Sequence, residues 1–329
     1  MSLCVAWLRE ENGNQEMIFA TDSCLSAGER WHYGVKLFEL PRKDCLISFA
    51  GDTKRTYTLI LNLISSIKFD KHLSSPSTDI EEILEYLSNL FTDLSNSITS
   101  YGTQSFDDAV GNFEFLFGGW SWKQNRFRLW KLEYKHDLHA VGHDEITQDT
   151  KLFAFIGDEI EVAEDLLKTE IRNLGREFSR EFDMEPLKVL VEMIRKEEYD
   201  YIDGAIQFAK IYPPGETEFF GVVWPSIDGK KTFLGKDVTY KNNPHVRYID
   251  PDTGIVLNET IPQKLSELPS SVNSFDMTFI EKCYIGDNLK LKEGVSIREQ
   301  SMLKQIFEEM LYRKFLEENN GVDDEQFND

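Results

Sequence analysis

The chain has 329 residues, of which 41% are hydrophobic, so it can bury the core of one large domain, alone or with a smaller companion. Its formal net charge of −22 argues against binding to nucleic acid or to an anionic membrane, because both partners need a basic face. No apolar run is long enough to span a bilayer and no signal peptide opens the chain, so we expect a cytoplasmic protein.

Short apolar strands make up the start of the chain. They are predicted at 2–8, 16–23, 35–40 and 45–50, and the step Asn12-Gly13 predicts a hairpin turn between the first two. A strand that begins at residue 2 ties the start of the chain into a sheet, where an α-amine would be held in place.

Helices and further strands then follow in blocks. Apolar spacing predicts helices at 53–67 and 78–97, the second with an acid-rich, capped start at Asp79. The remaining elements are strands at 112–120, 126–134 and 151–157, a helix from about 160 to 171, a helix from 185, and a strand at 205–211.

This order of elements resembles the N-terminal nucleophile hydrolases of the proteasome β-subunit and HslV type. The residues that carry the resemblance are Ser2, Ala20-Thr21-Asp22-Ser23, Val35-Lys36-Leu37, Ser48-Phe49-Ala50-Gly51 and the strand that ends in Gly118-Gly119-Trp120. The resemblance covers roughly the first two-thirds of the chain. Because members of that family assemble into rings, it also implies self-association into a ring or another homo-oligomer.

The element order fits an α+β fold of the αββα type, a four-layer sandwich with two antiparallel sheets between helix layers. We expect this domain to span 1–211 and a C-terminal extension of mixed strands and a terminal helix to span 212–316. The acidic segment 317–329 has almost no apolar side chains, which predicts disorder.

The extension contains no catalytic motif. Strands are predicted at 218–224, 231–235 and 279–285, and a helix at 296–316. A lid, a subunit interface and a partner-docking module all remain open as roles for it.

Ser2 is the predicted nucleophile. A seryl hydroxyl needs a base, and a free N-terminal amine, with a pKa of roughly 7.7–8.0, can serve as that base. This requires removal of Met1, which a small second residue permits. An ammonium at Lys36 would disfavour protonation of the amine, Asp22 would orient Lys36, and the Gly51 amide would bind the oxyanion.

Two further acids complete the predicted catalytic set. The resemblance implies a Gly-Ser-Gly turn that supports the amine, but here the turn reads Gly157-Asp158-Glu159, and Asp158 would raise the pKa of the amine that it binds. The resemblance also implies an acid between the helix from 185 and the next Gly-led strand. By its offset from Gly204, Glu198 fits best, with Asp200 in reserve; a solvated helix end is the alternative.

Other chemistry has weaker support. Cys4 is a rival nucleophile, but it lies two residues into the strand, and the four cysteines show no CxxC pair and predict reduced, mostly buried thiols. The cluster His136, His139 and His143 has residue types that bind transition metals, yet no helix places all three on one face. We therefore expect no metal and no cofactor.

The sequence thus predicts an amide-bond hydrolase, a peptidase acting on peptide or protein substrates through Ser2. The alternative is a catalytically inactive scaffold or partner-binding subunit of the same fold. The departure at Asp158 keeps that alternative open.

Overall fold

The structure is a computed structural model. It describes residues 2–11, 14–26, 29–99, 102, 105–147, 152–177, 179, 182–239, 244, 246–257, 274–285, 290–292, 302–303, 306–307 and 309–310. The chain divides into two compact units, the first spanning 1–238 and 248–256 and the second spanning 239–247 and 257–329. The predicted turn at Asn12-Gly13 and the predicted disordered tail at 317–329 lie outside the described residues.

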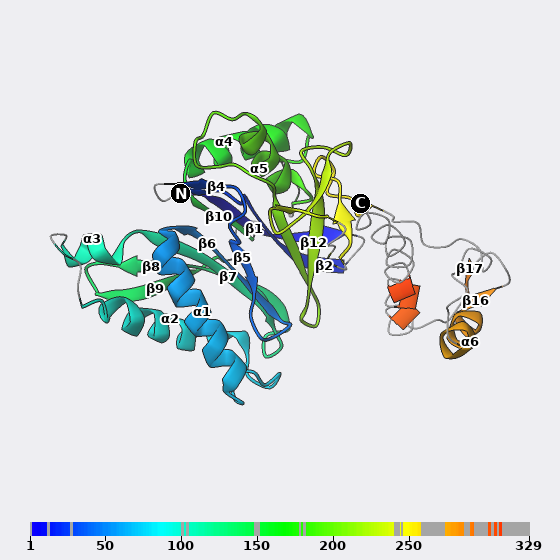
Figure 1. The fold of residues 1–329 in the computed structure, drawn as a ribbon, viewed down its shortest axis with the longest axis horizontal. Coiled ribbons are helices and arrows are strands. Elements are labelled where there is room, and N and C mark those ends of the chain that lie inside the picture. Colours follow the sequence, from blue (N-terminus) through cyan, green and yellow to red (C-terminus); the bar gives the residue numbers. More distant parts are fainter. Residues whose placement is uncertain are drawn as a thin grey trace, which may run out of the picture. The chain divides into compact units, whose positions relative to one another are not determined.

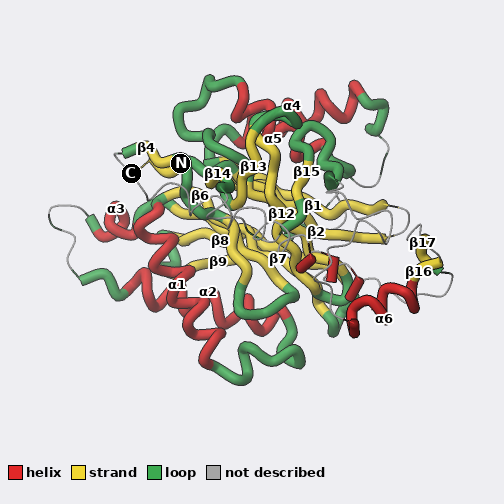
Figure 2. Tube along the Cα trace, turned by 45° about the vertical axis from the view of Figure 1, so that its right-hand side comes forward, coloured by secondary structure: helices red, strands yellow, loops and turns green. Residues whose placement is uncertain are grey.

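An eight-stranded sheet forms the centre of the first unit (Figure 2). Its strands are β1 (Leu3–Glu11), β2 (Asn14–Thr21), β10 (Phe153–Gly157), β11 (Gln207–Tyr212), β12 (Glu216–Trp224), β13 (Lys230–Phe233), β14 (Lys236–Asp237) and β15 (Tyr248–Ile249). The order is β10-β1-β2-β11-β12-β13-β14, all antiparallel, with β15 added parallel to β12. The first strand therefore lies inside the sheet, between β10 and β2.

A five-stranded antiparallel sheet is the second large sheet. Its order follows the chain: β5 (Leu37–Glu39), β6 (Cys45–Gly51), β7 (Phe113–Ser121), β8 (Arg126–Lys135) and β9 (Ala140–Glu145). Two small antiparallel pairs belong to neither large sheet: β3 (Leu25–Ser26) with β4 (Arg30–Trp31), and β16 (Tyr284–Ile285) with β17 (Lys290–Leu291).

Helices α1 (Thr53–Phe69) and α2 (Ile80–Asn96) pack on the five-stranded sheet (Figure 1), and the short α3 (Phe106–Val110) follows them in the chain. Their apolar faces share one hydrophobic cluster with β6–β9. The predicted start of α2 is confirmed: Asp79 and Glu82 form a reciprocal capping box.

Helices α4 (Ile160–Asn173) and α5 (Glu185–Arg195) pack on the eight-stranded sheet (Figure 1). Strand β1 is buried on both faces, and its side chains alternate between two clusters as the period of a strand requires. Leu3, Val5 and Trp7 join the cluster with α4 and α5, whereas Cys4 and Ala6 join a cluster with side chains of β6, β7 and β8.

The predicted αββα sandwich of two sheets is wrong. The chain is mostly antiparallel sheet, and its described residues form four sheets instead of two. The larger sheet also continues past Ile211 into β12–β15, because β12 pairs with β11 over Phe208–Tyr212. Strand partners are chosen by contacts far apart in the sequence, so an order of elements does not fix how many sheets they make.

The second unit has a small core of its own. Helix α6 (Ser274–Cys283) contributes Ile280 and Cys283, which cluster with Leu303, Phe307 and Met310. The strand predicted at 279–285 is therefore wrong, except for the two residues of β16. The helix predicted at 296–316 lies largely outside the described residues. No helix in the described part of either unit has the length and apolarity needed to cross a bilayer.

Candidate functional site

A buried ion pair lies where β2 ends and β5 begins. Lys36 Nζ donates to Asp22 Oδ2 at 2.7 Å, and both side chains are 0% exposed. Asp22 also accepts from the amides of Leu3 and Cys24, each at 3.0 Å. Burial raises the pKa of Asp22, and Lys36 and the two amides oppose that rise. Burying two charges is costly, so a fully enclosed pair of this kind is a candidate for function.

Asp158 binds residue 2 at both its backbone nitrogen and its carbonyl oxygen. The backbone nitrogen of Ser2 donates to Asp158 Oδ2 at 2.6 Å, and its carbonyl accepts from the Asp158 amide at 2.8 Å. Ser2 is 2% exposed. Burial raises the pKa of Asp158, whereas the hydrogen bond from Ser2 lowers it. The Asp158 carboxylate therefore lies at the backbone nitrogen of Ser2.

Two glycines bring the end of β6 next to Ser2. Gly157 has φ +109°, and a Cβ there would lie 1.9 Å from the Ser2 carbonyl oxygen and 3.0 Å from the Cβ of Ala50. Gly51 has φ +106°, and a Cβ there would lie 2.4 Å from the Asn112 carbonyl oxygen. Both positions require glycine. The predicted oxyanion residue, Gly51, thus directly follows Ala50, whose side chain lies beside Gly157.

Five of the six predicted catalytic residues are brought together and Glu198 is not. Ser2, Asp22, Lys36, Gly51 and Asp158 converge where β1, β2, β6 and β10 meet. Glu198 is exposed beyond α5, as is Asp200, and no described hydrogen bond or ion pair joins either acid to the five.

Asp203 lies against the site instead. Its amide faces Asp22 Oδ2 at 3.5 Å, and its carbonyl accepts from the Ser23 amide at 3.2 Å. The one feature of the sequence that could have pointed to Asp203 is its position directly before Gly204. In the structure this glycine has φ +84°.

Two more polar side chains at the site are absent from the sequence prediction. Gln207 accepts from the Lys36 and Leu37 amides at 2.9 and 3.2 Å. Glu114 accepts from the Gly157 amide at 2.8 Å. Each is a polar residue in a largely apolar strand, and buried polar groups in such strands normally have hydrogen-bond partners.

The rival nucleophile Cys4 is fully buried. Its thiol donates to the Phe49 carbonyl at 3.0 Å and lies 3.0 Å from the Thr21 hydroxyl. Burial raises the pKa of Cys4 to about 12, so the thiol is protonated at neutral pH and is a poor nucleophile. All four cysteines are buried, as predicted, and none is in a disulfide in the structure.

The three clustered histidines have separate surroundings. His136 lies 3.1 Å from an Asp107 carboxylate oxygen, His139 takes a left-handed turn conformation with φ +48°, and His143 faces Leu132 across β8 and β9. Among the described residues, no group of three or more His, Cys, Asp and Glu side chains is placed to hold a metal ion.

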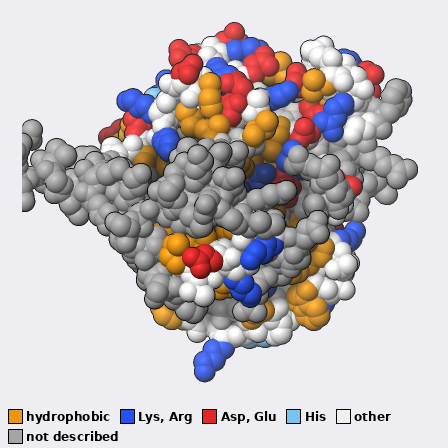
Figure 3. Space-filling model, turned by 90° about the vertical axis from the view of Figure 1, so that its right-hand side faces the viewer, with side chains coloured by type: hydrophobic (Ala, Val, Ile, Leu, Met, Phe, Trp, Pro, Cys, Tyr) orange, Lys and Arg blue, Asp and Glu red, His pale blue; other side chains and the backbone are white. Residues whose placement is uncertain are grey.

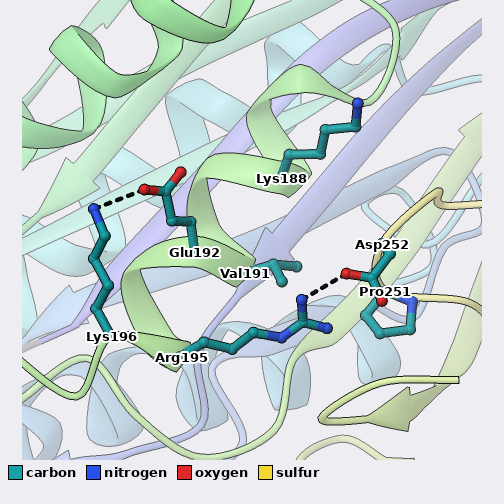
Figure 4. Close-up of a pocket in the computed structure, with 7 residues that line it drawn as sticks. All are labelled: Lys188, Val191, Glu192, Arg195, Lys196, Pro251 and Asp252. Carbon is teal, nitrogen blue, oxygen red and sulfur yellow. Dashed lines mark hydrogen bonds and ion pairs between the residues drawn. The ribbon is translucent and has the colours of Figure 1, made fainter. Parts of the chain in front are cut away.

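A surface hollow of about 330 Å³ lies over α5 (Figure 4) and is lined by Lys188, Val191, Glu192, Arg195, Lys196, Pro251 and Asp252. Its three cations are paired: Arg195 with Asp252 at 2.5 Å, Lys196 with Glu192 at 2.6 Å and Lys188 with Glu170 at 3.2 Å. None of the predicted catalytic residues lines it. On the face shown in Figure 3, acidic and basic side chains are likewise intermixed over the described surface.

Comparison with known proteins gives structural likeness only. No family model matches the chain, and no curated protein matches it. Among solved structures, it resembles Anbu (ancestral beta-subunit) from Yersinia bercovieri, with 18% identity, a TM-score of 0.47, and coverage of 64% of this chain and 82% of that one. It also resembles the helical assembly of the Anbu complex from Pseudomonas aeruginosa, with 15% identity, a TM-score of 0.48, and coverage of 66% and 86%.

The family assignment made from the sequence is therefore wrong. Membership of the N-terminal nucleophile hydrolases of the proteasome β-subunit and HslV type finds support neither in a family model nor in a curated relative. The solved structures that resemble the chain include Anbu proteins, at identities of 15–18% and TM-scores below 0.5. Function has to be argued from this chain's own site.

Proposed function

We propose that this chain is an amide-bond hydrolase in which Ser2, freed by removal of Met1, is the nucleophile and its own α-amine is the base. The substrate class is a peptide or protein. One observation carries the proposal: residue 2 is held by Asp158 at its nitrogen and carbonyl, while Asp22 ties a buried Lys36 to the next amide along the strand.

This arrangement suits nucleophilic catalysis because it fixes the reacting residue before substrate binds. Once Met1 is removed, the nitrogen that now donates to Asp158 as a peptide N–H becomes an amine. The amine takes the proton of the Ser2 hydroxyl as its oxygen attacks the substrate carbonyl carbon. The C–N bond then breaks, and the proton passes to the leaving amine.

Water completes the cycle by attacking the resulting ester, with the same amine as base, which returns the hydroxyl to Ser2. The Gly51 amide is the proposed donor to the oxyanion. Lys36 supplies a nearby positive charge that disfavours protonation of the amine, and Asp22 holds Lys36 in place. Glu198 has no part in this mechanism.

A second candidate is a catalytically inactive scaffold or partner-binding subunit. It is favoured by the 2% exposure of Ser2 and by the position of Asp158, whose carboxylate would stabilise the ammonium form of the amine. Self-association into a homo-oligomer is compatible with either candidate, and the elution volume of the purified protein would test it.

Intact mass separates the two candidates. The purified protein is weighed before and after incubation with a peptide epoxyketone, a reagent that needs a hydroxyl and a free amine on one residue. For an active site at Ser2, we expect loss of Met1 and a single adduct that Ser2→Ala abolishes. Ser48→Ala is the matched control, because Ser48 is also a buried serine in a central strand. Retained Met1, or no adduct on a chain that has lost it, would favour the scaffold.

A further inference from the structure

The β3–β4 hairpin lies in the chain between Asp22 and Lys36, the two members of the buried ion pair. Its strands pair Leu25 with Trp31 and Ser26 with Arg30. Its base is tied to the end of β2, because Ser23 donates to the His32 carbonyl at 2.7 Å and accepts from the Gly34 amide at 2.9 Å. The described residues of this segment, 23–26 and 29–35, thus connect the two members of the ion pair.

A single carboxylate joins this hairpin to the loop after α5. Asp203 Oδ2 accepts from Arg30 at 2.5 Å and lies 3.4 Å from His32 Nε2, while Asp203 Oδ1 accepts from the Gly204 amide at 2.6 Å. The Asp203 side chain is 25% exposed. It thus contacts Arg30 in β4 and His32, which directly follows that strand.

The backbone of the same residue reaches the buried pair. The Asp203 carbonyl accepts from Ser23, and its amide faces Asp22 Oδ2, the oxygen that also accepts from Lys36 and Cys24. The backbone at Gly204 packs closely on Ser23, because a Cβ at Gly204 would lie 2.4 Å from the Ser23 hydroxyl oxygen. Movement of the Asp203 carboxylate would therefore be transmitted to the environment of Asp22.

We infer that Asp203 is a positioning residue: its carboxylate clamps the Arg30–His32 side of the hairpin and, through its own backbone, fixes Asp22 and Lys36 in the geometry that Ser2 needs. The consequence for the reaction rests on the proposed function. The clamp itself does not, because it is a property of the folded chain.

Cys24 provides a readout that is independent of activity. Its thiol is 0% exposed, its amide binds Asp22, and its side chain lies within hydrogen-bonding reach of Arg30. If the hairpin lifts, Cys24 becomes accessible before the deeper Cys4 and Cys45, which are also 0% exposed and serve as internal controls for global unfolding.

The test compares Asp203→Asn, Arg30→Gln and Arg30→Lys with the parent chain. Each protein is treated with N-ethylmaleimide at pH 8, and the alkylated cysteines are located by peptide mass mapping. We expect Cys24 to react about tenfold faster in Asp203→Asn and Arg30→Gln, with Cys4 and Cys45 unchanged. Arg30→Lys keeps the ion pair and should retain protection. Glu197→Gln, at an exposed acid in the same loop, is the matched control.

The rate of epoxyketone adduct formation at Ser2 is measured on the same proteins. We expect it to fall about threefold or more in Asp203→Asn and Arg30→Gln and to be restored in Arg30→Lys. Unchanged Cys24 protection in the first two variants would overturn the clamp. Faster Cys24 alkylation with normal adduct formation would overturn the positioning role. If the parent protein forms no adduct at Ser2 while Asp203→Asn makes Cys24 react faster, the proposed function is disproved and the clamp is upheld.

Discussion

Removal of Lys36 tests the buried ion pair most directly. Lys36→Met keeps the length of the side chain but leaves Asp22 enclosed without its cation. Breaking a buried pair in this way costs about 3–5 kcal/mol of unfolding free energy. Because Asp22 keeps the Leu3 and Cys24 amides as donors, we expect the lower end, about 3 kcal/mol at pH 7.5.

The sign of the pH dependence follows from the pKa of Asp22. Burial raises this pKa and Lys36 opposes the rise, so removal of Lys36 raises it further. A carboxyl whose pKa is higher in the folded state contributes stability below its unfolded pKa, roughly 3.9, and loses it as the pH rises. The deficit of Lys36→Met should therefore be smallest near pH 4 and grow toward neutral pH.

Urea unfolding followed by tryptophan fluorescence measures this deficit. All six tryptophans lie in the first unit, so the signal reports the unit that holds the pair. Lys210→Met is the matched control: Lys210 is a buried lysine 2.8 Å from Glu16, but Glu16 keeps Arg9 at 2.9 Å when Lys210 is lost. We expect the control to lose less than about 2 kcal/mol. A deficit below about 1 kcal/mol in Lys36→Met, or one that shrinks as the pH rises, would refute this reasoning.

Two further predictions concern the same region. Gly157→Ala places a methyl group 1.9 Å from the Ser2 carbonyl oxygen at φ +109°, so it should cost more than about 3 kcal/mol of unfolding free energy, measured in urea. The control Gly175→Ala, at φ +65° with open space, should cost about 1 kcal/mol. Equal losses would contradict the argument that crowding at Ser2 requires glycine at position 157. With its pKa raised to about 12, Cys4 should be thiolate in only about one molecule in 10⁴ at pH 8. A disulfide reagent should therefore leave Cys4 unmodified in the native protein and modify it in urea. Rapid modification of the native protein would show that the reagent reaches the buried side chains around β1.

Local pattern was enough to predict many of the elements. Strand β7, strand β8 and helix α2, including its cap at Asp79, follow from alternation, helical spacing and capping chemistry that act between near neighbours. The same reasoning failed at 279–285, where a short apolar run forms the end of α6 because Ile280 and Cys283 pack against Leu303 and Phe307. A short apolar run fits the period of a helix as well as that of a strand, so its packing partners decide which of the two forms.

The sequence by itself determined where the candidate site begins, because Ser2, Asp22, Lys36, Gly51 and Asp158 each stand at the end or start of a predicted strand. Only the tertiary structure decided which loop acid meets them. Glu197 has φ +53°, a left-handed turn just after α5, and Glu198 beyond it is exposed, while the chain returns to bring Asp203 against Asp22. Which acid faces the pair depends on the path of a loop and on strand partners far apart in the chain, and residue spacing does not encode either.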